Sequence, residues 1–239
     1  MIPCRECKKP TEYTQEIINE PLFGGNPKVA VCDDCCEKDR LRQKKDNTEF
    51  KQFVQQPVED CIRPLYMETS ITKLPTEAQI HWQNLQHWTP SIKYGVRLCG
   101  DSRTGKTRLM CLLLRKLHAN GEVFKIFYAG EFHAELNSAK RGGHYMSWRD
   151  EVVNIPILAI DDLFAEKMTP TIESGLFEVI NQRMERRLPL LYTSQVTEKE
   201  CVAMFSEPRR GQAFYNRLRE TCKLYHFTRQ TQGEFSGTH

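Results

Sequence analysis

The chain has 239 residues, of which 39% are hydrophobic and 27% are charged, so it is long enough for one substantial core and a small additional module. Its longest apolar runs fall far short of the roughly 20 residues that a membrane-spanning helix needs, which excludes that class of protein. The sequence from Met1 to Cys4 has neither the basic nor the apolar region of a signal peptide. We therefore expect a cytoplasmic protein with reduced cysteines and no membrane contact. The net charge of +3 permits contact with nucleic acid without requiring it.

Four cysteines near the amino terminus form two C-x-x-C pairs, namely Cys4 with Cys7 and Cys32 with Cys35. Four thiolates at this spacing are the ligand set of a closed tetrahedral zinc site, although Cys36 could replace Cys35 as the fourth ligand. The module of residues 1–38 has few large apolar side chains and could hardly fold without metal, so we expect the Zn²⁺ to be structural. Disulfides or a redox pair fit a cytoplasmic chain less well.

A polar segment, residues 39–60, is expected to link this module to a large domain of residues 61–239. In the large domain, short apolar segments alternate with amphipathic ones, which is typical of an α/β fold with a mostly parallel sheet. The expected strands are Tyr94–Cys99, Val123–Ala129, Ile155–Asp161, Leu190–Ser194 and Lys223–Thr228. The expected helices are Lys106–Ala119, Thr171–Arg186, a third one that begins with the capping box of Thr197 and Glu200, and Arg209–Glu220. The tail, residues 230–239, is expected to be frayed.

Residues Gly100 to Thr107 fit the pattern G-x-x-x-x-G-K-[ST] at every fixed position, between an expected strand and a leucine-rich helix. Backbone N–H groups and the positive end of that helix would surround the β-phosphate of ATP or ADP. Lys106 would reach the β- and γ-phosphates, and the hydroxyl of Thr107 would bind Mg²⁺. The alternative is a chance turn that contains glycine. The residues expected to contact nucleotide are Gly100, Arg103, Thr104, Gly105, Lys106, Thr107, Arg108 and Asp161.

A second acidic motif, Asp161-Asp162, follows the expected buried strand that ends there. In open α/β sheets, ligands bind at the carboxyl ends of the strands, where such a strand can present charge. Asp161 would hold Mg²⁺ through water, and Asp162 would orient the attacking water. Taken alone, the motif would more simply be an aspartate that caps the next helix; beside the phosphate-binding pattern, the catalytic interpretation is preferred.

With these motifs, the sequence resembles the DnaC/IstB-like branch of the AAA+ ATPases, which comprises helicase loaders and transposition helper ATPases. The resemblance spans about Ile62 to Thr228 and also rests on Phe177–Arg183, Leu188–Ser194 and Phe214–Arg219. It implies a P-loop AAA+ core of the ASCE type with a five-stranded sheet.

The resemblance also assigns two further site residues. Gln195 stands where the family carries the sensor 1 asparagine, beside the γ-phosphate or its water. Arg217 matches the position of an arginine finger, which acts on the ATP of a neighbouring subunit and therefore implies self-association. Without the resemblance, Arg217 is nearly as well explained as a surface arginine on an amphipathic helix.

The sequence departs from the family pattern at three points, and two of them, the shorter base at Asp162 and the incomplete lid, suggest slow, switch-like hydrolysis of ATP. Arg103 replaces a glycine in the phosphate-binding pattern, and Asp162 replaces the glutamate of many AAA+ proteins. No extended lid domain is expected after the last strand. Without that lid, the sensor 2 residue stays unassigned. Arg229 is the one nearby candidate, and it is not given this role.

A zinc module joined to this core resembles the DnaI-type helicase loaders. This implies ATP-dependent loading of a hexameric, DnaB-type replicative helicase onto single-stranded DNA during DNA replication. One alternative is a transposition helper ATPase that binds duplex DNA. A second is a P-loop kinase of small molecules, and a third is a degenerate ATPase whose zinc module reads DNA directly.

Overall fold

The computed structural model describes residues 56–92 and 94–229, which belong to the unit from Phe53 to His239. The predicted zinc ligands Cys4, Cys7, Cys32 and Cys35 and the predicted frayed tail lie outside the described residues, as does most of the predicted linker. Within the described part, no helix is long and apolar enough to cross a membrane.

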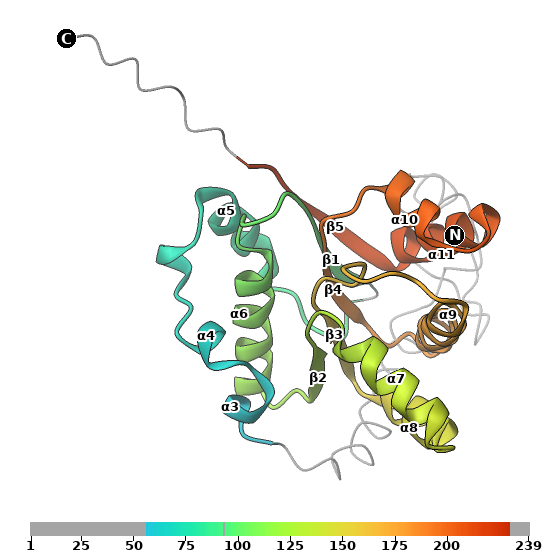
Figure 1. The fold of residues 1–239 in the computed structure, drawn as a ribbon. Helices are drawn as coiled ribbons and strands as arrows, with labels where there is room; N and C mark the ends of the chain where they lie inside the picture. The colour runs from blue at the N-terminus through green and yellow to red at the C-terminus, as the bar shows by residue number, and fades with distance from the viewer. Residues whose placement is uncertain (1–55, 93, 230–239) are drawn as a thin grey trace, which may run out of the picture. The chain divides into compact units, whose positions relative to one another are not determined.

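Five parallel strands form one sheet in the order β2-β3-β4-β1-β5 (Figure 1). The strands are β1 (Gly95–Gly100), β2 (Phe124–Phe127), β3 (Ile157–Ile160), β4 (Leu190–Ser194) and β5 (Cys222–Phe227). All five expected strands are confirmed, with each bound within two residues of the expected position. The expected mostly parallel sheet is also confirmed, and every pairing in it is parallel.

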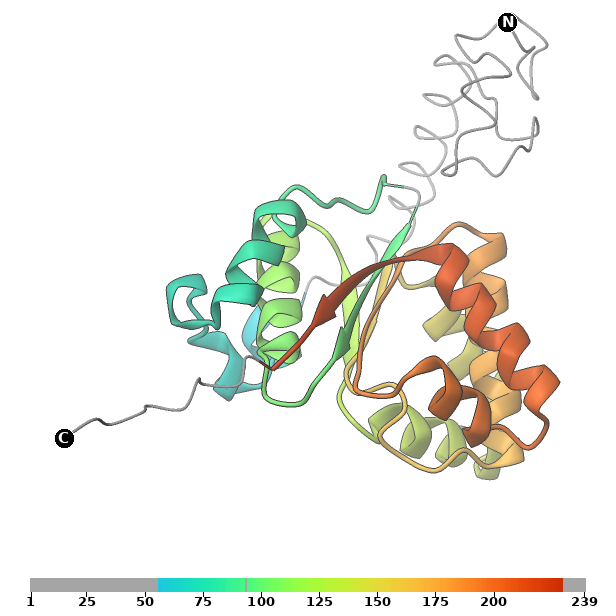
Figure 2. The same cartoon turned by 90° about the horizontal axis from the view of Figure 1, so that it is seen from above.

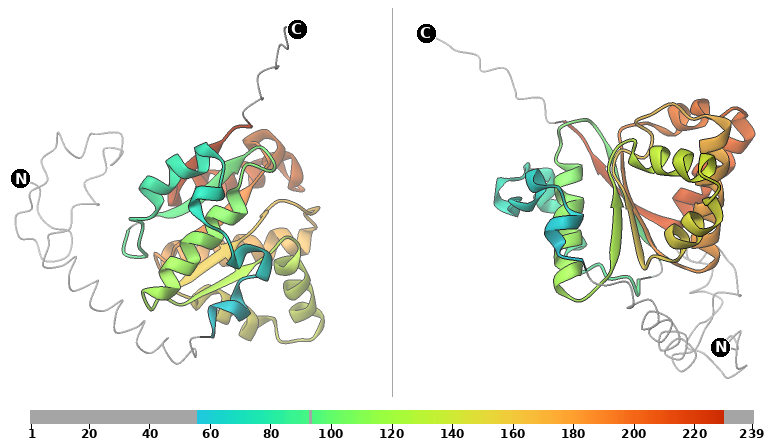
Figure 3. Two further views of the ribbon diagram at one scale, coloured as in Figure 1. Left: turned by 90° about the vertical axis from the view of Figure 1, so that its left-hand side faces the viewer. Right: turned by 60° about the horizontal axis from the view of Figure 1, so that its bottom comes forward.

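Helices cover both faces of this sheet. The helices are α3 (Val58–Cys61), α4 (Pro64–Met67), the 3-10 helix η2 (Ile71–Lys73), α5 (Thr76–Leu85), α6 (Lys106–Ala119), α7 (Glu131–Arg141), α8 (Tyr145–Asn154), α9 (Pro170–Glu185), α10 (Glu198–Met204) and α11 (Pro208–Thr221). Helices α3 to α6 lie on one face and α7 to α11 on the other, as Figures 1 and 2 show. The right-hand view of Figure 3 shows the sheet between these two layers.

Two hydrophobic cores fill the space between the sheet and its two helical layers. In β3, Ile157 and Ala159 pack into the core on the α6 side, whereas Leu158 and Ile160 pack into the core on the α9 side. Successive side chains of a strand point to opposite faces, so a strand covered on both sides needs apolar residues throughout. This explains the continuous apolar run that predicted β3 from the sequence.

The predicted capping box at the start of α10 is confirmed. The Thr197 hydroxyl accepts a hydrogen bond from the backbone N–H of Glu200, and the Glu200 carboxylate accepts one from the backbone N–H of Thr197 at 2.7 Å. Two N–H groups that the helix itself leaves unpaired are thereby satisfied.

Helices α7 and α8 and the short helices before β1 were not predicted. In α7 the signal was present, because Phe132, Leu136 and Ala139 recur at the spacing of one helix face and are all buried. The segment before β1 gave a weaker signal, since its helices are short and α3 begins at Val58, inside the expected linker.

The fully buried side chain of Arg183 in α9 joins the end of α8 to the starts of β3 and β4. Its guanidinium donates hydrogen bonds to five backbone carbonyl groups, those of Val152, Val153, Ile155, Pro156 and Pro189. Within the described residues, no carboxylate pairs with it, and burial lowers its pKa to about 9. A cation at the carbonyl end of α8 also complements the helix dipole. Arg183 therefore ties the end of α8 to the segments that lead into β3 and β4.

Candidate nucleotide-binding site

The turn from Gly100 to Gly105 connects the carboxyl end of β1 to the first residue of α6. Gly100, Arg103 and Gly105 have positive φ angles of 130°, 61° and 90°. A Cβ atom on Gly100 would lie 1.9 Å from the carbonyl oxygen of Phe227 in β5, so only glycine fits there. Arg103 adopts the left-handed backbone that glycine adopts without strain, so the shape of the turn survives this departure from the family pattern.

Lys106 is buried, and its ammonium group lies inside this turn. Its Nζ atom donates hydrogen bonds to the carbonyl oxygens of Gly100, at 2.9 Å, and Asp101. The Thr104 hydroxyl donates to the same Asp101 oxygen at 2.8 Å. Burial lowers the pKa of Lys106, and the nearby carboxylate of Asp162 opposes that shift. Phosphate oxygens would replace the carbonyl acceptors and compensate the buried charge, so the turn suits an anionic ligand.

Asp161 receives two hydroxyl hydrogen bonds at the end of β3. Its Oδ1 atom accepts from Thr107 Oγ1 at 2.8 Å and from Thr193 Oγ1 at 2.7 Å. Burial raises the pKa of Asp161, while the two hydroxyl donors act in the opposite direction. A nearby cation would stabilise the charged carboxylate.

Thr107 and Asp161 form a donor set that fits Mg²⁺. Their hydroxyl and carboxylate oxygens are the hard ligands that this ion prefers, and it usually keeps several waters and phosphate oxygens as its other ligands. Among the residues that the structure describes, no group of three or more His, Cys, Asp or Glu side chains is arranged to hold a metal.

Asp162 lies beside Asp161 and meets the end of β4. Its backbone N–H donates to the Thr193 hydroxyl at 2.8 Å, and its φ angle is 49°. The Gln195 Nε2 atom lies 3.3 and 3.5 Å from the two carboxylate oxygens of Asp162. The structure thus brings together the two residues that were expected to act on water, and the longer glutamine side chain bridges the distance.

Arg108, expected at the nucleotide, contacts other parts of the chain. Its Nη1 atom lies 3.3 Å from both the carbonyl oxygen of Leu65 and the hydroxyl of Thr69. The side chain therefore joins α6 to α4, at Leu65, and to the segment between α4 and η2, at Thr69.

Arg217 lies near the carboxyl end of α11, shortly before β5 begins. In a parallel sheet this is the amino-terminal edge, whereas the phosphate-binding turn lies at the carboxyl edge. The guanidinium lies 4.6 Å from the ring centroid of Phe177, and its Nη1 atom is 3.4 Å from the carbonyl oxygen of Ala213. One chain therefore does not bring Arg217 to its own phosphate-binding turn.

A family model described as IstB-like ATP binding protein matches residues 85–232, which include the whole phosphate-binding turn and both aspartates. The chain belongs to this IstB-like family. Membership in a family of ATP binding proteins assigns nucleotide binding to the chain.

This IstB-like chain is 26% identical over 216 residues to the replicative helicase loader DnaI of Bacillus subtilis (strain 168), with 82% of this chain and 67% of DnaI covered. A crystal structure of DnaI superposes with a TM-score of 0.59 at 20% identity, covering 70% of this chain and 95% of that one. A crystal structure of the DnaC helicase loader gives 0.59 at 17% identity and covers 69% and 99% of the two chains. DnaA from Aquifex aeolicus bound to AMPPCP gives 0.54 at 13% identity and covers 64% and 47%. The expected AAA+ fold is confirmed.

Thr193 was not among the expected site residues of this IstB-like chain. Its hydroxyl donates to Asp161 and accepts from the backbone of Asp162, so one side chain fixes both aspartates. The available signal was a polar residue near the carboxyl end of an otherwise apolar strand, beside the strand that carries the acidic pair.

Proposed function

We propose that this chain is an ATP-dependent loader of a replicative DNA helicase. The observation that carries the proposal is its likeness to the replicative helicase loader DnaI across 82% of the chain. The phosphate-binding turn and the acidic pair support the ATP dependence, because they bring together the groups expected to bind a magnesium nucleotide.

In this proposal, the turn from Gly100 to Thr107 binds the phosphates and Lys106 contacts the β- and γ-phosphates. Thr107 and Asp161 hold Mg²⁺, which neutralises charge on the phosphate oxygens when it is bound. Asp162 orients the attacking water, and Gln195 holds the Asp162 carboxylate through the amide contact described above.

Arg217 completes the active site of a neighbouring subunit, so the protein self-associates through its ATP sites. The position of Arg217 at the opposite edge of the sheet from its own phosphate-binding turn supports this role. Arg217→Ala should bind ATP as the unaltered chain does and hydrolyse it far more slowly. Adding Lys106→Ala protein, which still carries Arg217, should restore turnover at mixed interfaces. Normal turnover by Arg217→Ala alone contradicts the role.

The amino-terminal module, residues 1–38, is proposed to bind one structural Zn²⁺ and to hold the helicase. The core is proposed to bind single-stranded DNA, and the protein acts in the cytoplasm. Its ligands would be Cys4, Cys7, Cys32 and Cys35. The full-length Cys4→Ser variant should lose both zinc, measured by elemental analysis, and the capture of a hexameric replicative helicase, while it keeps nucleotide binding. Absence of zinc from freshly reduced protein contradicts the zinc site. Helicase capture without zinc contradicts the role of the zinc-bound module in holding the helicase.

A second candidate function is that of a transposition helper ATPase that binds duplex DNA, and the family description, which names IstB, favours it. A binding assay with purified helicase and purified transposase, each with ATP and with single-stranded or duplex DNA, separates the two functions. Capture of the transposase on duplex DNA, without capture of the helicase, replaces the loader proposal.

A further inference from the structure

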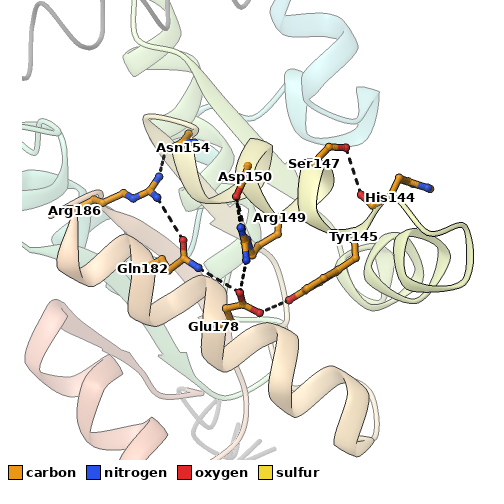
Figure 4. Close-up of polar contacts among 9 residues, drawn as sticks. All are labelled: His144, Tyr145, Ser147, Arg149, Asp150, Asn154, Glu178, Gln182 and Arg186. Atoms are coloured by element: carbon orange, nitrogen blue, oxygen red, sulfur yellow. Dashed lines mark hydrogen bonds and ion pairs between the residues drawn. The ribbon is translucent and has the colours of Figure 1, made fainter.

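Two adjacent residues of α9, Phe177 and Glu178, contact different helices. The Glu178 carboxylate accepts hydrogen bonds from the hydroxyl of Tyr145 at 2.6 Å and from Nη1 of Arg149 at 2.7 Å, both in α8. Figure 4 shows these contacts together with a third, from Gln182 in α9 itself. The Glu178 carboxylate is therefore engaged by side chains of α8.

The ring of Phe177 instead meets α11. The guanidinium carbon of Arg217 lies 4.6 Å from its centroid and that of Arg210 lies 5.5 Å from it. The same ring lies 5.7 Å from the ring of Phe214, which is buried. Within the described residues, neither arginine forms an ion pair with an aspartate or glutamate, and their shared contact is this ring.

We propose that Phe177 is a positioning residue that holds Arg217 ready for the phosphates of a neighbouring subunit, an inference that rests on the function proposed above. A carboxylate here would neutralise the guanidinium and compete with the phosphate for its N–H donors. An aromatic face attracts the cation without taking those donors, and it restrains a long side chain that would otherwise lose more entropy on binding. Glu178, the carboxylate next to Phe177 in the sequence, is engaged by Tyr145 and Arg149 of α8.

The test compares Phe177→Leu and Phe177→Tyr in the full-length chain. Phe177→Leu keeps an apolar side chain but removes the ring, and it should lower turnover at saturating ATP about three- to tenfold with unchanged nucleotide affinity. Phe177→Tyr keeps the ring and should stay within about twofold of the unaltered chain. Phe177→Met, a second ringless variant, should reproduce the loss if the leucine variant folds poorly.

The matched control is Phe205→Leu. Phe205 packs on the same Phe214 ring, at 5.1 Å, so this variant disturbs the same aromatic cluster without removing a ring that contacts an arginine. It should leave turnover unchanged. An equal loss in Phe205→Leu, or normal turnover in both ringless variants, overturns the inference.

Mixing experiments with Lys106→Ala protein distinguish a failure of this inference from a failure of the proposed arginine finger. Lys106→Ala subunits carry both Phe177 and Arg217, so adding them should restore the turnover of Phe177→Leu protein. If Arg217→Ala is slow but the ringless variants are normal, only the role of Phe177 fails. If Arg217→Ala itself is normal, the arginine finger fails and the role of Phe177 fails with it.

Discussion

Replacing Asp161 by asparagine should stabilise the ligand-free protein while it removes magnesium-dependent nucleotide binding. Both hydroxyl donors, from Thr107 and Thr193, reach the same oxygen, Oδ1, which an asparagine carbonyl can replace. The substitution therefore keeps two hydrogen bonds and removes a charge from a side chain that is 6% exposed.

The direction of this stability change follows from the pKa of Asp161, which burial raises above its ordinary value in the folded chain. The charged carboxylate therefore lowers stability at neutral pH, and this loss disappears as the pH falls through the raised pKa. Single stabilising substitutions commonly give about 0.5–2 kcal/mol. For a domain of this size, each kcal/mol corresponds to a rise in Tm of roughly 2–4 °C.

The assay is calorimetric unfolding of ligand-free protein over a series of pH values, repeated with Mg²⁺ and ATP. Asp161→Asn should unfold at a higher temperature near neutral pH, and the difference should shrink in acid. With Mg²⁺ and ATP the unaltered chain should instead unfold at the higher temperature, because ligand stabilises only the chain that binds it. A ligand-free variant that unfolds at or below the Tm of the unaltered chain refutes the reasoning.

Asp162→Asn is the matched control for this experiment. Asp162 is only half-buried and meets the exposed amide of Gln195, so its substitution should change Tm little. It should keep nucleotide binding and suppress turnover, since it removes the carboxylate that is proposed to orient the attacking water.

Further variants test the turn, the threonine and the buried arginine. Lys106→Ala should abolish tight ATP binding in a titration, because it removes the buried cation that is proposed to contact the phosphates; unchanged affinity contradicts the assignment. Thr193→Val should lower stability by about 1–3 kcal/mol and slow turnover, because it leaves the backbone N–H of Asp162 without its acceptor. Arg183→Met should lose about 3 kcal/mol in chemical unfolding by leaving buried carbonyl groups unpaired. Arg186→Met, at an exposed position on the same helix turn, should lose little, and equal losses contradict this role for Arg183.

Local patterns in the sequence predicted the candidate nucleotide site and determined most of the elements around it. The spacing from Gly100 to Thr107 predicts its own geometry, because a turn that wraps a phosphate needs glycine, lysine and a hydroxyl at fixed intervals. The apolar run before Asp161 predicts a strand covered on both faces and places the acidic pair at its carboxyl end. The Thr197 capping box predicts the start of α10, because both of its partners lie within one helix turn and the pattern is local in the sequence.

Contacts between distant residues were decided only by the tertiary structure. Thr193 fixes Asp161 from 32 residues away, and this depends on β3 and β4 being neighbours in the sheet. Arg183 is an ordinary helix residue by pattern, yet packing turns it towards carbonyl groups at the end of α8 and before β3 and β4. Phe177 and Glu178 are adjacent in sequence but lie on different sides of α9, so the packing of α8 and α11 decides which contact each makes. Periodicity tells which side of a helix is buried, but the partner on that side depends on how the chain packs as a whole.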